Sequence, residues 1–159
     1  MSRVRMLLAL ASLSVLLTGC ATLGAKYTPA TAVPANRAAV YVYRPGKFVG
    51  GALSPNVQAN GVPLSDLNAG GYFVYLAAPG ELTLTARTEA TTSVTLDIKA
   101  GETYYVQGSI GIGFFVGHPH LVIVSKDVGE KEIQDCKLIP GTIPTAEAVA
   151  AGPPPTARK

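Results

Sequence analysis

Hydrophobic and polar residues alternate along the middle of the chain with a period of two. In residues 82–87 and again in residues 94–99, each apolar residue is followed by a threonine or a charged residue. Because successive side chains of a strand point to opposite faces, this pattern predicts two strands with one buried and one solvent-facing side. Residues 39–44 and 71–77 are β-branched and aromatic runs that predict strands. Residues 121–124 are apolar at every position and predict a central strand.

Turn residues separate these runs. Asn60-Gly61 joins residues 55–59 to residues 62–67, and this dipeptide is the strongest short hairpin signal. Further turns are expected at Pro79-Gly80 and at Ala100-Gly101. The sequence therefore predicts an all-β domain over residues 37–139. We expect a small antiparallel β-sandwich, Ig-like or transthyretin-like, of six to eight strands, with a short helical turn within residues 128–136 near the C-terminus.

The first twenty residues have the order of a lipoprotein signal peptide. Arg3 and Arg5 precede an apolar run at residues 6–17, which is too short for a bilayer-spanning helix of about 20 residues. The letters LTGC follow at residues 17–20 and resemble a bacterial lipobox. This resemblance implies cleavage after Gly19, which removes residues 1–19, and lipid attachment to the thiol and the new amino group of Cys20.

The residue after the lipidated cysteine bears on the choice of membrane. It is Ala21, whereas an aspartate at this position usually marks retention in the inner membrane. The resemblance therefore implies a protein lipid-anchored in the outer membrane of a Gram-negative cell and facing the periplasm. Two or three acyl chains hold a protein firmly at a bilayer, because each buried CH₂ contributes about 0.8 kcal/mol.

Two segments flank the expected domain and have no hydrophobic period. Residues 20–36 are rich in Ala, Thr and Pro and predict a lipidated flexible tether. Residues 140–159 are Ala, Pro and Gly with almost no large apolar side chain, and they predict a disordered tail.

Charge and cysteine content narrow the possible functions. The chain has a formal net charge of +3. Without Arg3 and Arg5, 11 basic side chains stand against 10 acidic ones, which argues against a nucleic-acid partner. If Cys20 carries lipid, Cys136 is the single remaining cysteine, and we expect a buried thiol rather than an intermolecular disulfide.

The stretch GIGFFVGHPH at residues 111–120 allows several interpretations. A dinucleotide loop requires a helix after the glycines, whereas a β-branched run follows here. Insertion of this stretch into the membrane surface is an alternative interpretation that the sequence leaves undecided. His118 and His120 would share one face of a strand, but two ligands are too few for a closed zinc site, so no metal is expected. The favoured interpretation is a connection between two strands with Phe114 and Phe115 in the core.

Two groups of residues are candidates for contacts with a ligand. Tyrosines on neighbouring strands could form an exposed stacking face for glycan, or they could be core residues whose hydroxyls reach water. The candidate stacking residues are Tyr41, Tyr43, Tyr72 and Tyr75. Lys47 and Phe48 lie among glycines in residues 45–54, and this segment is the candidate contact loop.

The order of motifs resembles that of a known family. Four segments carry the likeness over residues 40–138: VYVYRPGKFVGGALSP, GGYFVYLAAPGELTLTA, GETYYVQGSIGIGFFVGHPHLVIV and GEKEIQDCKL. They resemble the bacterial lipoprotein family called domain of unknown function 2846. Residues 57–86 are also similar, with looser spacing, to PEGA-type β repeats of bacterial surface proteins. The resemblance implies a fold and a cell-envelope setting, and it implies no activity.

Three functions remain as hypotheses. We expect a non-enzymatic, lipid-anchored envelope protein whose β domain binds another envelope component. The first alternative is a glycan- or peptidoglycan-binding module, which requires the tyrosines to share one exposed face. The second is a hydrolase, for which only His118 and His120 are available as histidine bases. No cofactor is expected, and the expected partners are the membrane and an envelope protein or glycan.

Overall fold

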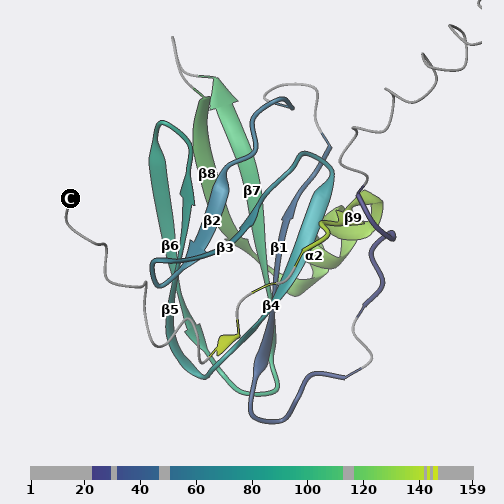
Figure 1. Ribbon diagram of the computed structural model, residues 1–159. Helices are drawn as coiled ribbons and strands as arrows, with labels where there is room; N and C mark the ends of the chain where they lie inside the picture. The colour runs from purple at the N-terminus through teal and green to yellow at the C-terminus, as the bar shows by residue number, and fades with distance from the viewer. Residues whose placement is uncertain are drawn as a thin grey trace, which may run out of the picture.

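The computed structural model describes residues 23–29, 32–46, 51–112, 117–141, 143, 145 and 146. These residues form two packed β-sheets with a short helix on the outer face of one sheet (Figure 1). The five-stranded sheet contains, in spatial order, β8 (Gly117–Val124), β7 (Thr103–Ile112), β1 (Ala38–Arg44), β4 (Gly71–Ala77) and β9 (Lys137–Leu138). The four-stranded sheet contains β3 (Val62–Asp66), β2 (Asn56–Ala59), β5 (Gly80–Arg87) and β6 (Thr91–Ile98). The predicted β-sandwich is confirmed.

The core between the sheets follows from the alternation in the sequence. On β5, Leu82 and Leu84 are buried, while Thr83 and Thr85, which alternate with them, stay partly accessible. The two leucines belong to the same core cluster as Val40 and Val42 of β1, which are fully buried. Burial of a Val or Leu side chain stabilises a fold by roughly 1.5–3 kcal/mol, so this apolar layer holds the sheets together.

The predicted hairpin at Asn60-Gly61 is confirmed. Both residues have positive φ, 48° and 83°, as a two-residue type I′ turn requires. Ala59 pairs with Val62 across this turn. The predicted helical turn is also confirmed, as α2 (Lys126–Glu132) continued by the 3-10 helix η1 (Ile133–Asp135).

Two pairings in the five-stranded sheet are parallel, β1 with β7 and β4 with β9. Because β1 and β7 run side by side in one direction, both finish at the same end of the sandwich. We call this end, where Arg44 pairs with Gly71, the Arg44 end. Lys137 pairs with Gly71 from the other side, so β9 also begins at the Arg44 end.

The prediction that residues 121–124 form a central strand is wrong. They belong to β8, which lies at the edge of the five-stranded sheet and pairs with β7. Leu121 is buried, but Val122 and Ile123 are about half exposed, at 50% and 47%. The all-apolar run at residues 121–124 therefore forms part of an edge strand and exposes two of its hydrophobic side chains.

The predicted tether and tail are partly wrong. In residues 20–36, the segment 23–29 is docked on the domain, and Tyr27 is buried. In residues 140–159, Ala146 is buried in the core between the sheets, and Ile143 packs against that core. Among the residues that the structure describes, no helix has the length and hydrophobicity to cross a bilayer.

Candidate functional site

Five buried tyrosines cover the outer face of the five-stranded sheet beneath α2. This aromatic layer consists of Tyr27, Tyr41, Tyr43, Tyr72 and Tyr105, each at most 6% exposed. Alternation along β1 explains it, since Val40 and Val42 point into the sandwich and the tyrosines beside them point out. The outer face of this sheet therefore has a second apolar core, roofed by α2 and η1.

The rings of the aromatic layer pack with defined geometry. Tyr41 pairs with Tyr105 across β1 and β7, and their rings are stacked at 5.2 Å with an angle of 10°. Tyr27 meets the rings of Tyr41 and Tyr72 edge-on, at 5.5 Å and 5.6 Å. Each such aromatic pair contributes about 0.5–1.5 kcal/mol beyond its buried area.

Tyr27 also makes a hydrogen bond inside the layer. Its hydroxyl lies 3.0 Å from the hydroxyl of Tyr105. Burial raises the pKa of both phenols above the ordinary value of 10, so both stay protonated at neutral pH. Through its ring contacts and this hydrogen bond, the Tyr27 side chain attaches the N-terminal segment to the sheet.

Glu132 joins α2 to the same face. Its Oε2 accepts a hydrogen bond of 2.7 Å from the Tyr43 hydroxyl and a second bond from the Gln107 amide. Burial, and then the bond to Glu132, raise the pKa of Tyr43. At Gly129 the helix touches the sheet directly, because a Cβ atom there would lie 2.3 Å from Cγ of Tyr105.

The prediction of an exposed stacking face is wrong. Tyr41, Tyr43 and Tyr72 belong to the aromatic layer under α2, and Tyr75 points the other way into the core between the sheets. All four are buried, and they do not share one face. Both faces of β1 and β4 are covered, one by the four-stranded sheet and the other by α2 and the N-terminal segment, so these four tyrosines form no exposed platform.

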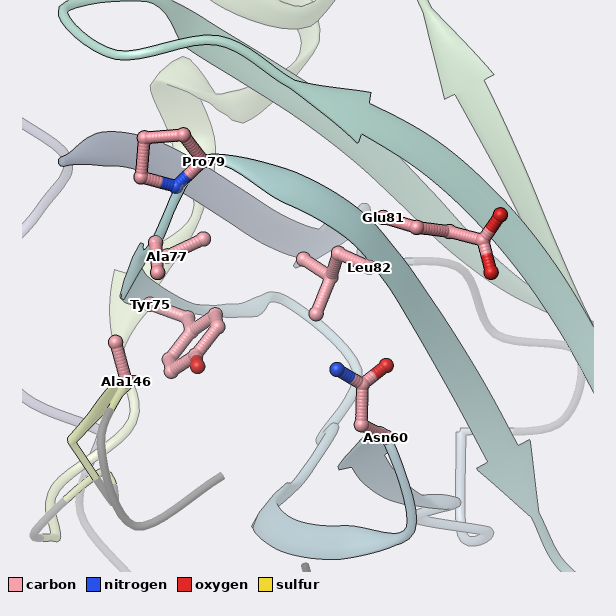
Figure 2. A pocket seen from close by; sticks show the side chains of 8 residues that line it. Asn60, Tyr75, Ala77, Pro79, Glu81, Leu82 and Ala146 are labelled. Carbon is pink, nitrogen blue, oxygen red and sulfur yellow. The ribbon is translucent and has the colours of Figure 1, made fainter. Parts of the chain in front are cut away.

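Tyr75 reaches a small pocket at the end of the sandwich opposite the Arg44 end. Figure 2 shows Tyr75, Leu82 and Ala146 around this space, with Asn60 at its rim. Its volume is about 130 Å³. Ligand pockets usually measure about 300–1,000 Å³, so this space is small for a sugar or cofactor.

The N-terminal segment adds to the edge of the five-stranded sheet. The Gly24 amide donates to the Leu138 carbonyl, and the Leu138 amide donates to the Ala25 carbonyl, at 2.6 Å and 2.8 Å. Lys26 and Lys137 form an antiparallel bridge. In Figure 1 this purple segment runs beside β9 and α2. The chain therefore meets the domain as an extra strand beyond β9.

A second pocket of about 310 Å³ lies where this segment approaches the four-stranded sheet. Leu23 and Ile139 form its apolar side, and Ser65, Asp66 and Asn68 its polar side. Asn68 donates a hydrogen bond to the Ser54 hydroxyl at its rim. Apart from the carboxylate of Asp66, the polar groups of the pocket are neutral hydroxyls and an amide, so its chemistry is that of a polar surface.

Cys136 is buried, as the sequence predicts, and is a free thiol. Its Sγ donates to the Arg44 carbonyl at 3.6 Å. Burial raises the pKa of the thiol to about 11, with a smaller contribution from Asp135. A thiol of this kind stays protonated at neutral pH and is a poor nucleophile.

Several predicted residues lie outside the described ranges. These are Gly19, Cys20, Lys47, Phe48, Phe114 and Phe115. Residues 113–116 connect β7 to β8, since Ile112 pairs with Gly117. His118 and His120 are exposed on β8, opposite Gly111 and Ser109. In the described part of the chain, no three His, Cys, Asp or Glu side chains gather at metal-binding distance.

Three residues with structural roles, Tyr27, Glu132 and Ala146, were not predicted from the sequence. Tyr27 is the one aromatic residue between Cys20 and Arg37, and an aromatic side chain in an Ala/Thr/Pro-rich segment is the feature that could have marked it as docked. Glu132 and Ala146 lie in segments of ordinary composition. Only their neighbours in space distinguish them.

The fold and these contacts can be compared with known proteins. A family model described as "Protein of unknown function (DUF2846)" matches residues 34–118. The matched part runs from just before β1 to the start of β8, so it includes the whole four-stranded sheet and strands β1, β4 and β7 of the five-stranded sheet. No curated protein matches the chain.

Proposed function

The chain belongs to the family of proteins of unknown function DUF2846, and we propose that it is a lipid-anchored cell-envelope protein with a non-catalytic binding domain. Its anchor is Cys20, and its setting is the periplasmic face of the outer membrane. Its β-sandwich binds another component of the envelope. The first sequence feature behind this proposal is the basic start, short apolar run and LTGC motif at residues 17–20.

The docked N-terminal segment is the single observation that carries the proposal. From Gly24, four residues after Cys20, the chain joins the sandwich through hydrogen bonds to Leu138, and Tyr27 fixes it there by a hydrogen bond to Tyr105. Four extended residues span at most about 14 Å. A lipid on Cys20 therefore keeps the domain against the bilayer, which suits a protein that meets partners at the membrane surface.

The chemistry of the described residues favours binding over catalysis. Cys136 is buried with a pKa of about 11, and the carboxylate of Glu132 is occupied by Tyr43 and Gln107. His118 and His120 lie exposed on an edge strand. A nucleophile, a base and an orienting group need to lie within hydrogen-bond reach of one another, and these groups are dispersed over the molecule.

The exposed edge strand β8 is the candidate contact for a partner. Val122 and Ile123 are the most exposed of the large hydrophobic side chains in the described residues. Apolar groups on an edge strand are costly for a protein that stays alone, because such edges pair with other chains. An envelope protein that contributes an extended segment would cover them.

Fractionation of cells tests the anchor. The Cys20→Ala variant should lose incorporation of labelled palmitate and should no longer float with outer membranes, whereas Cys136→Ala should keep both. Flotation of Cys20→Ala with outer membranes would refute the anchor.

Photo-crosslinking in living cells tests the binding role. A crosslinker in place of Val122 should give a discrete adduct, and one in place of the exposed Thr95 on β6 should not. The absence of a Val122-specific adduct would refute β8 as the contact.

A further inference from the structure

We infer that Lys26, Lys137 and Leu138 form a membrane-facing surface that contacts the headgroups of anionic phospholipids. This inference rests on the proposed lipid anchor at Cys20. It specifies which part of the domain touches the bilayer and which lipids it prefers. We call these three residues the headgroup surface.

The length of the chain before the docked segment limits where the bilayer lies. Leu23 is three residues after Cys20, and the Gly24 amide bonds to the Leu138 carbonyl at 2.6 Å. Since each extended residue spans at most about 3.6 Å, Leu138 lies within roughly 20 Å of the anchored residue. The edge of the sandwich formed by the docked segment and β9 is therefore held close to the headgroups.

The charge of this edge indicates the chemistry of its partner. Lys26 and Lys137 pair directly across an antiparallel bridge, and both are exposed. Like charges at directly opposite strand positions destabilise a sheet. Within the described residues neither lysine forms an ion pair, whereas Lys126 does with Glu130. The phosphates of two neighbouring lipids would neutralise the two ammonium groups, and even one phosphate between them would reduce their repulsion.

An exposed apolar side chain lies beside this charged pair. Leu138 is 40% exposed and lies at the same edge of the sheet, but as the strand neighbour of Lys137 it points to the opposite face. A sheet edge that lies against a bilayer exposes both of its faces to the lipids, so the lysines on one face bind the phosphates while the leucine on the other enters the apolar boundary of the headgroup region. The combination of two lysines and a leucine therefore fits a lipid surface better than it fits water.

Depth-sensitive fluorescence quenching tests this surface on the full-length lipidated protein. An environment-sensitive fluorophore is attached to Leu138→Cys, and a matched reporter is attached to Ala100→Cys in the exposed turn before β7. The protein is incorporated into phosphatidylcholine vesicles with quencher-labelled lipid, with and without phosphatidylglycerol. We expect strong quenching at position 138 in the anionic vesicles and little quenching at position 100.

Charge variants identify the cause of the quenching. Near an anionic leaflet each lysine strengthens binding about fivefold, so Lys26→Gln with Lys137→Gln should weaken the surface contact on the order of thirtyfold. Quenching at position 138 should then fall to its value in neutral vesicles. Lys26→Arg with Lys137→Arg should keep it, and the matched pair Lys99→Gln with Lys126→Gln should leave it unchanged.

The outcomes separate this inference from the proposed anchor. The headgroup surface would be overturned, and the anchor left intact, if the protein floats with the vesicles but shows no quenching at position 138. Quenching that is unchanged when Lys26 and Lys137 are substituted would have the same meaning. Protein that carries no lipid and does not float would overturn the anchor, and the headgroup surface with it.

Discussion

The hydroxyl oxygens of Tyr27 and Tyr105 lie 3.0 Å apart beneath α2, in a layer of buried tyrosines. Tyr27 belongs to the segment that follows Cys20, and Tyr105 belongs to β7 inside the five-stranded sheet. This bond and the ring contacts around it make residues 23–29 part of the domain. A lipid on Cys20 would then fix the orientation of the domain as well as its location.

Substitution of Tyr27 should show how firmly the segment is held. Tyr27→Ala should lower the free energy of unfolding by about 3–5 kcal/mol, the usual cost of an aromatic ring lost from a core. Tyr27→Phe keeps the ring but leaves the Tyr105 hydroxyl without its partner, at about 1–2 kcal/mol. Urea unfolding measures both values. If Tyr27→Ala unfolds like the wild type, the segment is not docked in solution.

Substitution of Glu132 should loosen α2. Glu132→Ala removes the acceptor for the Tyr43 hydroxyl and the Gln107 amide, so the free energy of unfolding should fall by about 2 kcal/mol or more. Glu132→Gln keeps one carbonyl oxygen as an acceptor, so its free energy of unfolding should fall by less. Glu130→Ala on the same helix is the control, since its ion pair with exposed Lys126 contributes at most about 1 kcal/mol. Equal losses for Glu132→Ala and Glu130→Ala, measured by urea unfolding, would contradict this role.

The stability of the protein should fall in alkali. Burial raises the pKa of Tyr27, Tyr43, Tyr72 and Tyr105 above 10 and that of Cys136 to about 11. The folded protein thus holds these protons more tightly than the unfolded chain does. Its free energy of unfolding should be constant up to about pH 8, where the thiol of the unfolded chain begins to ionise, and should decline steadily above that as the phenols of the unfolded chain ionise too.

Two signals recorded together test this decline. Tyrosinate absorbance and circular dichroism should change in one transition, because the phenols ionise as the aromatic layer opens. Titration of all the tyrosines near pH 10 with the fold intact would show that the layer is open to solvent.

The segment around Ala146 should contribute to stability. Ala146 is 5% exposed and packs beside Tyr75, so Ala146→Asp would place a carboxylate in an apolar site. We expect the melting temperature to fall by several degrees, which for a domain of this size corresponds to about 1–2 kcal/mol. Ala100→Asp in the exposed turn is the control and should change little. A similar melting temperature for both variants would show that the tail does not pack.

Local patterns in the sequence predicted the strands and their turns well. The Asn60-Gly61 dipeptide has the positive φ angles that its hairpin needs, and the alternation at Leu82 and Leu84 gives their burial. These features depend on neighbours in the chain, so the sequence displays them directly. The burial of Cys136 was predicted from the tendency of free thiols to pack as small hydrophobic side chains.

Features that depend on distant segments were predicted poorly. The run at Val122 and Ile123 has the composition of a central strand, but an edge position depends on which strands pair with it. Tyr41 and Tyr43 alternate with valines as exposed residues would, and only the return of α2 over the sheet buries them. Tyr27 looked like part of a tether because its partners come from β1, β4 and β7, far along the chain.

The intact mass of the protein extracted from its own membranes tests the central claim most directly. We predict a chain that begins at Cys20 and carries the mass of a thioether-linked diacylglyceryl group and an amide-linked acyl chain. Fragmentation should place both additions on Cys20. A mature chain with a free Cys20 thiol, or a chain that still contains residues 1–19, would contradict the account.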